Sequence, residues 1–167
     1  MILTIWRHGE AEEGARDRRR ELTSSGCDDI GFGCRQLHEA CSTRRISHPD
    51  TILYSPWERT LQTAEIITAA YTHARAVADT ALQPGSDIAS VDAVLSGMVE
   101  SDNRAEHVLV VSHQPLVSHL VEHYLGGPDL VPSLSPGGLV TMFLDVLAPS
   151  CATLLFWALP PEYEAGT

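Results

Sequence analysis

The alternation of apolar and polar positions predicts short buried strands separated by amphipathic helices. Three apolar runs, at residues 1–6, 51–55 and 107–112, have the length and composition of strands buried on both faces. Elsewhere apolar side chains recur at three- and four-residue spacing, which predicts helices. Their expected ranges are about 23–41, 57–71, 87–101 and 115–125. This order of strands and helices is typical of an α/β sandwich.

The end of the chain follows a different pattern. Residues 139–146 and 153–159 are largely apolar and flank a Pro-Ser turn, which predicts an antiparallel hairpin. A further short strand is expected within residues 75–82. We expect a single domain over residues 1–160 and a C-terminal tail over residues 161–167.

Composition and charge narrow the range of functions. The 167 residues carry 22 acidic and 11 basic side chains, a formal charge of −11, and every basic residue is arginine. The acidity argues against a general nucleic-acid-binding protein, because phosphate backbones attract basic surfaces. The absence of lysine excludes Schiff-base catalysis and the lysine of a P-loop. Any phosphate or carboxylate must therefore be held by arginine, histidine or backbone N–H groups.

The sequence predicts neither a membrane span nor a secretion signal. No run approaches about 18 apolar residues, and the first residues lack a basic segment followed by a long apolar one. Cys27, Cys34 and Cys41 repeat every seven residues, which places them on one helix face but about 10 Å apart, beyond disulfide reach. We therefore expect buried free thiols on a core-facing stripe and a cytoplasmic location.

Arginine and histidine residues follow three of the predicted strands. The first strand ends in Arg7-His8-Gly9, and the strand at 107–112 ends in Ser112-His113. Arg59 lies one turn into the helix that follows the second strand. Each residue alone has an ordinary explanation as a surface or packing residue. Because ligands of open α/β sheets bind beyond the carboxyl ends of the strands, their shared placement predicts a phosphate pocket.

The residue types at these strand ends suit phosphoryl transfer. A neutral His8 imidazole can attack phosphorus in line and form a covalent phosphohistidine. Arg7 and Arg59 match the equatorial phosphoryl oxygens, and a protonated His113 would add a third cationic donor. Gly9 would let the backbone approach the phosphate closely.

The sequence contains no pattern typical of a metal site. His119 and His123 are four residues apart on a predicted helix, a spacing that can bind a metal ion. The preferred interpretation is an ordinary exposed or half-buried helix face.

Four segments, taken in order, resemble the signature of one family. They are Arg7-His8-Gly9-Glu10, residues 20–26 with Leu22-Thr23-Ser24-Ser25-Gly26, residues 55–64, and Val111-Ser112-His113-Gln114-Pro115. The histidine phosphatase (phosphoglycerate mutase-like) superfamily has similar Arg-His-Gly, Leu-Thr-x-x-Gly, Ser-Pro-x-x-Arg-x-x-x-Thr-Ala and late-strand histidine motifs. The match covers about the first 125 residues. Within the superfamily, the short chain is most similar to the SixA-type phosphohistidine phosphatases.

This resemblance implies a three-layer α/β sandwich, with a mostly parallel central sheet flanked by helices, and neither a metal nor an organic cofactor. It implies that His8 is the nucleophile and that Arg7, Arg59 and His113 form the phosphate pocket. Further substrate contacts are expected from Gly9, Arg20 and Ser112.

The chain departs from the family pattern at the general acid. Larger members carry a carboxylic acid between the second and last motifs, whereas residues 82–87 contain no glutamate. Asp87 is either this acid or the N-cap of the next helix. Glu10, Glu12 and Asp17, in the loop after the nucleophile, are candidate acids or solvated charges.

The missing acid bears on the choice of substrate. A phosphomonoester releases a poor alkoxide leaving group and benefits from a positioned acid, whereas protonated phosphohistidine releases neutral imidazole. The predicted function is therefore hydrolysis of phosphohistidine on a protein such as a histidine phosphotransfer domain. Two alternatives stay open, a small-molecule phosphomonoesterase and a non-catalytic phosphate-recognition module. No nucleic-acid or membrane partner is expected.

Two further features allow two interpretations each. The run from Arg16 to Arg20 can attract an acidic partner or contact phosphate, with Arg20 best placed by its motif. Alternatively it is a solvated loop, balanced by the neighbouring Glu10, Glu12, Glu13 and Glu21. Trp57 can line the rim of the pocket or pack against the sheet.

Overall fold

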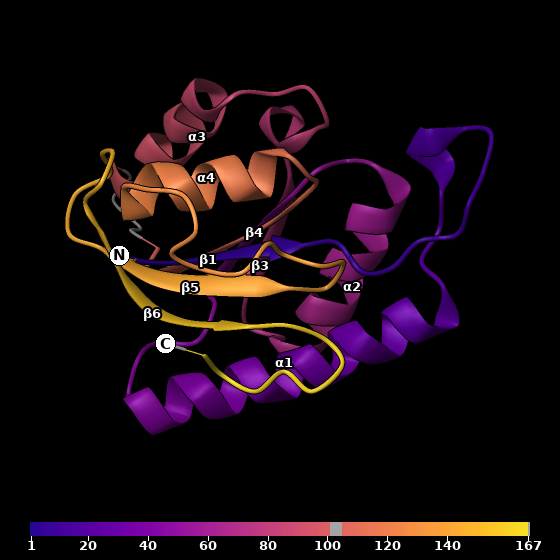
Figure 1. Cartoon of the computed structure of the whole chain (residues 1–167), viewed down its shortest axis with the longest axis horizontal. Helices are drawn as coiled ribbons and strands as arrows, with labels where there is room; N and C mark the ends of the chain where they lie inside the picture. Colours follow the sequence, from indigo (N-terminus) through magenta and orange to yellow (C-terminus); the bar gives the residue numbers. More distant parts are fainter. Residues whose placement is uncertain (101–104, 167) are drawn as a thin grey trace.

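The fold centres on one six-stranded sheet with the strand order β3-β2-β4-β1-β5-β6 (Figure 1). It is seen in a computed structural model that describes residues 1–100 and 105–166. The strands are β1 (Ile2–Arg7), β2 (Thr51–Tyr54), β3 (Arg75–Ala78), β4 (His107–Ser112), β5 (Leu139–Leu144) and β6 (Ala152–Ala158). The first four run parallel to one another, and β5 and β6 add an antiparallel hairpin at one edge. The predicted mostly parallel sheet with a C-terminal hairpin is confirmed.

Helices cover both faces of the sheet and complete the predicted three layers. They are α1 (Ser24–Arg44), α2 (Glu58–Ala70), α3 (Ile88–Glu100) and α4 (Leu116–Leu125). In Figure 1, α3 and α4 lie above the sheet, and α1 lies below it with α2 beside it. Side chains of β4 alternate between two cores, because Val108 and Val110 pack with α3 and α4, while Leu109 and Val111 pack with α1 and α2. This burial on both faces explains the unbroken apolar run.

Local capping sets the start of two helices. The Thr23 side chain accepts a hydrogen bond from the Gly26 N–H at the start of α1, and Asp87 accepts one from the Ser90 N–H at the start of α3. Both helices begin where the sequence predicts, since a side-chain oxygen satisfies a backbone donor there. The predicted end of the second of these helices, residue 101, lies outside the described residues.

The short strand expected within residues 75–82 is present as Arg75–Ala78, and Thr80–Leu82 after it form a short 3-10 helix (η2) that buries Leu82. The end of the chain differs from the sequence-based expectation. The described part of the predicted tail folds back, because Tyr163 is 1% exposed and donates a hydrogen bond to the Gly137 carbonyl. Burial of one aromatic ring therefore ties residues 161–166 to the domain, where a tail was expected.

All four cysteines are free, as expected for the three on α1. Cys34 and Cys41 are buried, Cys27 is half-buried and Cys151 is exposed. Burial raises the pKa of Cys34 and Cys41 to about 12, so these thiols are packing groups. Among the described helices none has the length and apolarity needed to cross a membrane.

A row of buried hydrogen bonds links the neighbouring strands β4, β1 and β5 towards the amino ends of the parallel strands. The His107 Nδ1–H donates to the Ser47 carbonyl at 2.7 Å, and its Nε2 accepts from the Thr4 hydroxyl at 2.7 Å. That hydroxyl is also 2.8 Å from the Thr141 hydroxyl on β5. Burial lowers the pKa of His107 to about 4, so the ring is neutral in the folded protein.

We expect the free energy of unfolding to fall as the pH drops from about 6.5 towards 4. In this window the unfolded chain protonates His107 while the folded chain does not, which favours unfolding. His107→Gln should make the decline shallower, by up to about 1.4 kcal/mol per pH unit. Urea denaturation at pH 7, 6 and 5 measures the slope, with the exposed His119→Gln as a control. An unchanged slope in His107→Gln would contradict this assignment.

Candidate active site

Three neighbouring strands bring the predicted site residues together. Strand β4 lies between β1 and β2, with Arg7 level with Ser112 and Tyr54 level with Val111. The residues that follow these strands therefore meet at one edge of the sheet. The His8 and His113 rings lie edge to face, with their centroids 5.1 Å apart.

These residues line a pocket of about 330 Å³. Its walls come from the ends of β1 and β4, from α2 and from the loop after β1. The lining residues are Arg7, His8, Glu10, Ala11, Asp17, Arg20, Arg59, Pro84, His113, Gln114 and Pro136. Cationic and imidazole side chains dominate one side of this pocket, which suits a phosphoryl group.

Hydrogen bonds fix the tautomer of His8. Its Nδ1 lies 2.7 Å from the Gly9 carbonyl oxygen, which can only accept, so Nδ1 carries the proton. The Nε2 atom is then a lone-pair acceptor, and it receives a hydrogen bond from Arg59 Nε at 3.0 Å. Burial, aided by the charges of Arg59, Arg7 and Arg20, lowers the pKa of His8 to about 4. At neutral pH His8 therefore presents an unprotonated Nε2 to the pocket, which is the form that a nucleophile requires.

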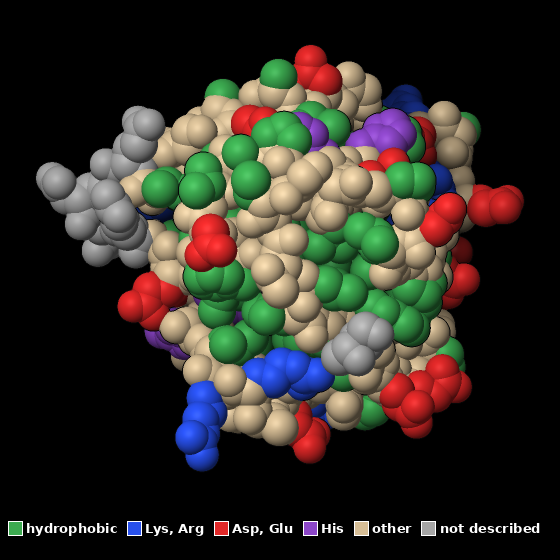
Figure 2. Space-filling view, turned by 60° about the vertical axis from the view of Figure 1, so that its left-hand side comes forward, with side chains coloured by type: hydrophobic (Ala, Val, Ile, Leu, Met, Phe, Trp, Pro, Cys, Tyr) green, Lys and Arg blue, Asp and Glu red, His purple; other side chains and the backbone are tan. Residues whose placement is uncertain are grey.

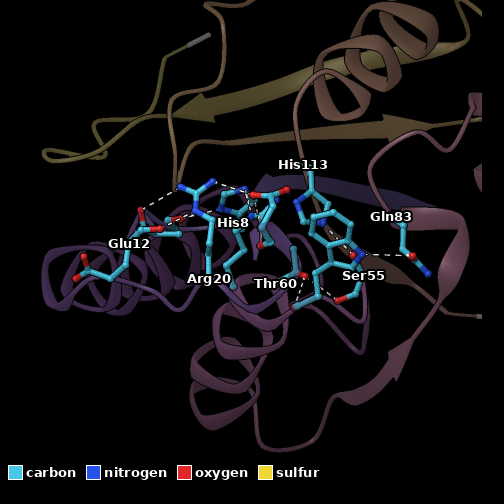
Figure 3. A network of polar contacts seen from close by, with 12 residues as sticks. His8, Glu12, Arg20, Ser55, Thr60, Gln83 and His113 are labelled. Atoms are coloured by element: carbon cyan, nitrogen blue, oxygen red, sulfur yellow. Dashed lines mark hydrogen bonds and ion pairs between the residues drawn. The ribbon is translucent and has the colours of Figure 1, made fainter. Parts of the chain in front are cut away.

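His113 is held by Ser55 and Trp57. Its Nε2 lies 2.9 Å from the Ser55 hydroxyl (Figure 3), and the Trp57 ring packs edge to face against it. Burial and the nearby His8 and Arg59 lower the pKa of His113 to about 3. The ring is therefore neutral. His113 does not carry the positive charge that would make it a third cationic donor. The reason is that desolvation and the neighbouring arginines both disfavour a third positive charge.

Two guanidinium groups, one buried and one half-buried, line the pocket with the histidines. Arg59 is 5% exposed, donates from Nη1 to the Asp17 carbonyl at 2.7 Å and lies over the Trp57 ring at 4.9 Å. Arg7 donates from Nη1 to the Leu134 carbonyl at 2.8 Å, which anchors its fork at the pocket wall. Burial and the charge of Arg59 lower the pKa of Arg7. A dianionic phosphoryl group would relieve this repulsion between like charges.

Arg20, in the loop after β1, is the third arginine that lines the pocket. Its guanidinium donates to the carbonyls of Glu12 (2.6 Å) and Ala11 (3.3 Å) and to the Asp17 carboxylate (3.0 Å; Figure 3). The same carboxylate lies 3.5 Å from Arg59. Asp17 thus joins two arginines and orients them towards one pocket.

Sequence comparison agrees with this geometry. No model of a known protein family matches the chain. The phosphohistidine phosphatase SixA homolog of Haemophilus influenzae is 32% identical over 130 residues, which cover 75% of this chain and 78% of the relative. The chain belongs to the SixA family of histidine phosphatases. The phosphohistidine phosphatase SixA of Escherichia coli is 29% identical over 147 residues, 87% of this chain and 86% of the relative.

A solved SixA structure shares the fold over almost the whole chain. The protein histidine phosphatase SixA complexed with tungstate superposes with a TM-score of 0.76 at 26% identity, covering 96% of this chain and 97% of the other. The three-layer sandwich of this chain is therefore that of the SixA family, including the C-terminal hairpin.

Against this SixA framework, two predicted substrate contacts lie outside the pocket lining. The Ser112 hydroxyl is buried and donates to the Leu82 carbonyl at 2.8 Å, which fastens β4 to η2. The Gly9 N–H donates to the Thr63 hydroxyl, and a Cβ at Gly9 would lie only 3.0 Å from Ile30. Gly9 thus packs closely against α1, and its contact with the phosphate stays a prediction.

The four candidate general acids take different places. Asp87 is exposed and caps α3 by accepting hydrogen bonds from Ser90, and it is absent from the pocket lining. Glu12 contributes its backbone carbonyl to Arg20, and its side chain does not line the pocket either. Glu10 does line the pocket and accepts a hydrogen bond from the Thr23 hydroxyl at 2.9 Å.

The fourth candidate, Asp17, is unsuited to donate a proton. Its hydrogen bond with Arg20, together with the charge of Arg59, holds the pKa of Asp17 below its ordinary value. The carboxylate is therefore ionised at neutral pH, and its role is to position two arginines. Glu10 is left as the one carboxyl among these four that borders the pocket in the described structure without an arginine partner.

We expect Asp17→Asn to lower kcat/KM by less than about tenfold. The amide keeps one acceptor for Arg20, and exposed ion pairs of this kind are weak. Loss of a true general acid would instead cost about 10²–10⁴-fold. Steady-state kinetics from pH 6 to 9 measure the effect, and a larger loss together with a missing alkaline limb would show that Asp17 is the acid.

Several residues that hold the pocket side chains in place lie outside the sequence prediction. The sequence assigns no role to Ser55 beyond its place in a motif at a strand end, and none to Gln83, which accepts a hydrogen bond from the Trp57 indole at 3.3 Å. The Leu134 carbonyl, which anchors Arg7, carries no sequence signal because any residue supplies a carbonyl. Trp57 packs against two of the pocket residues, His113 and Arg59. Its position directly after Ser55-Pro56 was the signal that could have decided between its two interpretations.

The histidine pair on α4 has an ordinary structural setting. His123 Nε2 lies 3.7 Å from the Asp92 carboxylate on α3, and His119 is exposed. Among residues 1–100 and 105–166, no three His, Cys, Asp or Glu side chains come together as a ligand group for a metal ion.

Proposed function

We propose that the chain hydrolyses protein phosphohistidine through a covalent phosphohistidine on His8. The observation that carries the proposal is the state of His8, a neutral ring with its proton fixed on Nδ1 and its Nε2 lone pair beside the buried Arg59. Membership of the SixA family supports it, since both relatives named above are described as phosphohistidine phosphatases.

In the first step the phosphoryl oxygens take the guanidinium groups of Arg7 and Arg59 as partners. Arg59 Nε then exchanges its bond to His8 Nε2 for one to the phosphoryl group, which frees the lone pair. Nε2 attacks phosphorus in line, and the electrons of the breaking P–N bond pass to the substrate ring. When that ring carries a proton on its other nitrogen, it leaves as neutral imidazole without a general acid.

In the second step water attacks phosphorus, and the P–Nε2 bond electrons return to His8. The water proton ends on the released inorganic phosphate. Throughout, Nδ1–H stays bonded to the Gly9 carbonyl, which fixes the orientation of the ring. The arginines stabilise the charge that spreads over the equatorial oxygens during both displacements.

The substrate class is tested by comparing two kinds of phosphoryl donor. We expect a higher kcat/KM for a phosphorylated histidine phosphotransfer domain than for any member of a sugar-phosphate panel. A reversed ranking would favour a small-molecule phosphomonoesterase with Glu10 as the acid, because Glu10 borders the pocket. Tight binding of the phosphoprotein without phosphate release would instead favour a recognition module. We place the activity in the cytosol, with the free cysteines as support.

A further inference from the structure

A basic loop tip lies beside the catalytic pocket, and the chemistry above makes no use of it. Arg16, Arg18 and Arg19 are exposed, the last two within the short 3-10 helix η1 (Asp17–Arg19). In the described part of the chain, none of these three side chains makes a hydrogen bond, ion pair or ring contact. Arg20, by contrast, donates hydrogen bonds to three partners within the protein. The three arginines are therefore available to a partner.

Contacts at the base of this loop hold its two ends together, so that Glu12 and Glu21 lie away from the arginines. An Ala11–Leu22 bridge and the bond from the Glu12 N–H to the Glu21 carbonyl pin the two ends together. The glutamates at positions 12 and 21 thus lie at the base, while the arginines lie at the tip. The tip also holds two carboxylates, of which Asp17 is already paired with Arg20 and Arg59 and Glu13 is exposed. Three arginines against the one carboxylate of Glu13 leave the exposed charge of the tip positive.

The tip projects from the same edge of the sheet as the pocket. In Figure 1 the indigo loop extends at the right, beyond the ends of the parallel strands. Asp17 and Arg20 line the catalytic pocket and also a second, open hollow formed by Glu13, Gly14 and Ala15. The surface is therefore continuous from His8 to residues 13–17 of the loop, next to which Arg18 and Arg19 follow in the chain. A carrier protein that places its phosphohistidine in the pocket meets this tip with the adjacent part of its surface.

The net charge of the chain affects where an acidic partner can bind. At −11, the protein repels an acidic partner over most of its surface. Figure 2, which looks towards the edge of the sheet opposite the pocket, shows acidic side chains scattered around the rim and its main arginine patch low on the α1 side. An acidic partner is therefore favoured in an orientation that brings it to the arginine tip and away from the acidic side chains.

We propose that Arg16, Arg18 and Arg19 form a docking surface for an acidic face of the phosphohistidine-bearing protein. The inference rests on the proposed function and extends it from the phosphoryl group to the carrier. Its physical basis is electrostatic steering, which raises association rates and weakens as salt screens the charges.

The test compares Arg18→Ser/Arg19→Ser with the wild type on two substrates. One is a phosphorylated histidine phosphotransfer domain with acidic side chains around its phosphohistidine, and the other is free phosphohistidine. We expect kcat/KM for the protein substrate to fall about tenfold at low salt, with the difference shrinking as salt is raised. Turnover of free phosphohistidine should not change. Arg18→Glu/Arg19→Glu should lose more, and a carrier with lysines in place of its acidic residues should restore turnover.

The matched control is Arg35→Ser/Arg45→Asn, which removes two exposed arginines, one within α1 and one at its C-cap. This helix begins beside the loop and ends about 30 Å away, and asparagine tolerates the left-handed backbone of Arg45. The control should match the wild type on both substrates. Equal losses on both substrates in the Arg18/Arg19 variant, or no loss on either, would overturn the docking surface while the proposed function stands. A wild type that turns over neither substrate would overturn the proposed function, and with it the docking surface.

Discussion

His8→Ala is expected to lower kcat by about 10⁴-fold or more and to abolish phosphorylation of the enzyme. The reason is that Nε2 is the atom to which the phosphoryl group is transferred, and removal of a nucleophile leaves only binding and electrostatic stabilisation. The measurement is phosphate release in steady state, together with trapping of radiolabelled phosphoenzyme during turnover. The label should be lost in acid and retained in alkali, as a phosphoramidate bond requires.

Two variants keep this experiment interpretable. His8→Asn preserves a side-chain N–H for the Gly9 carbonyl, so its fold should survive while its activity does not. His119→Ala removes an exposed histidine from α4 and should behave as the wild type. Activity and labelling that persist in both His8 variants would place the nucleophile elsewhere and overturn the mechanism.

Arg59→Met should lower kcat by about 10²–10⁴-fold, the second largest effect that we expect. Arg59 is buried against both His8 and Trp57, and its fork is placed to stabilise the charge of the transferring phosphoryl group. Arg59→Lys should recover little of this activity, because an ammonium group cannot bond two oxygens in a fork. The Arg35→Met variant provides a control on an exposed face of α1.

The same substitution has an independent spectroscopic consequence. The positive charge of Arg59 contributes to the low pKa of His8, behind the larger effect of burial. Without it, the pKa of His8 should rise from about 4 while staying below the ordinary value, since the ring is still buried. A titration followed by NMR of the imidazole nitrogens would show this. An unchanged pKa with unchanged kcat would mean that Arg59 is not part of the catalytic pocket.

Much of the fold and part of the site followed from local pattern. The helices and buried strands were predicted because apolar spacing and capping residues such as Thr23 act within a few neighbours along the chain. His8, Arg59 and His113 were found because strand ends of a parallel sheet meet at one edge, so motifs that follow strands can be read as one site. For these residues position in the sequence implies position in space.

Other roles depended on contacts between distant segments. The sequence alone could not choose between Asp17 as an acid and Asp17 as a partner of Arg20 and Arg59, because only the folded loop brings the three together. It could not give the protonation of His8 and His113, which burial and neighbouring charges decide.

The sequence by itself therefore determined the order of the elements, the arginine-only supply of cations and the residues that follow each strand. Tertiary structure alone decided where the remaining polar groups point. Ser112 turns to Leu82, Gly9 packs on α1, and Tyr163 ties down the end of the chain. The physical reason is that local spacing sets which face of an element a residue occupies, whereas desolvation, hydrogen-bond partners and close packing are set by what the rest of the chain places against it.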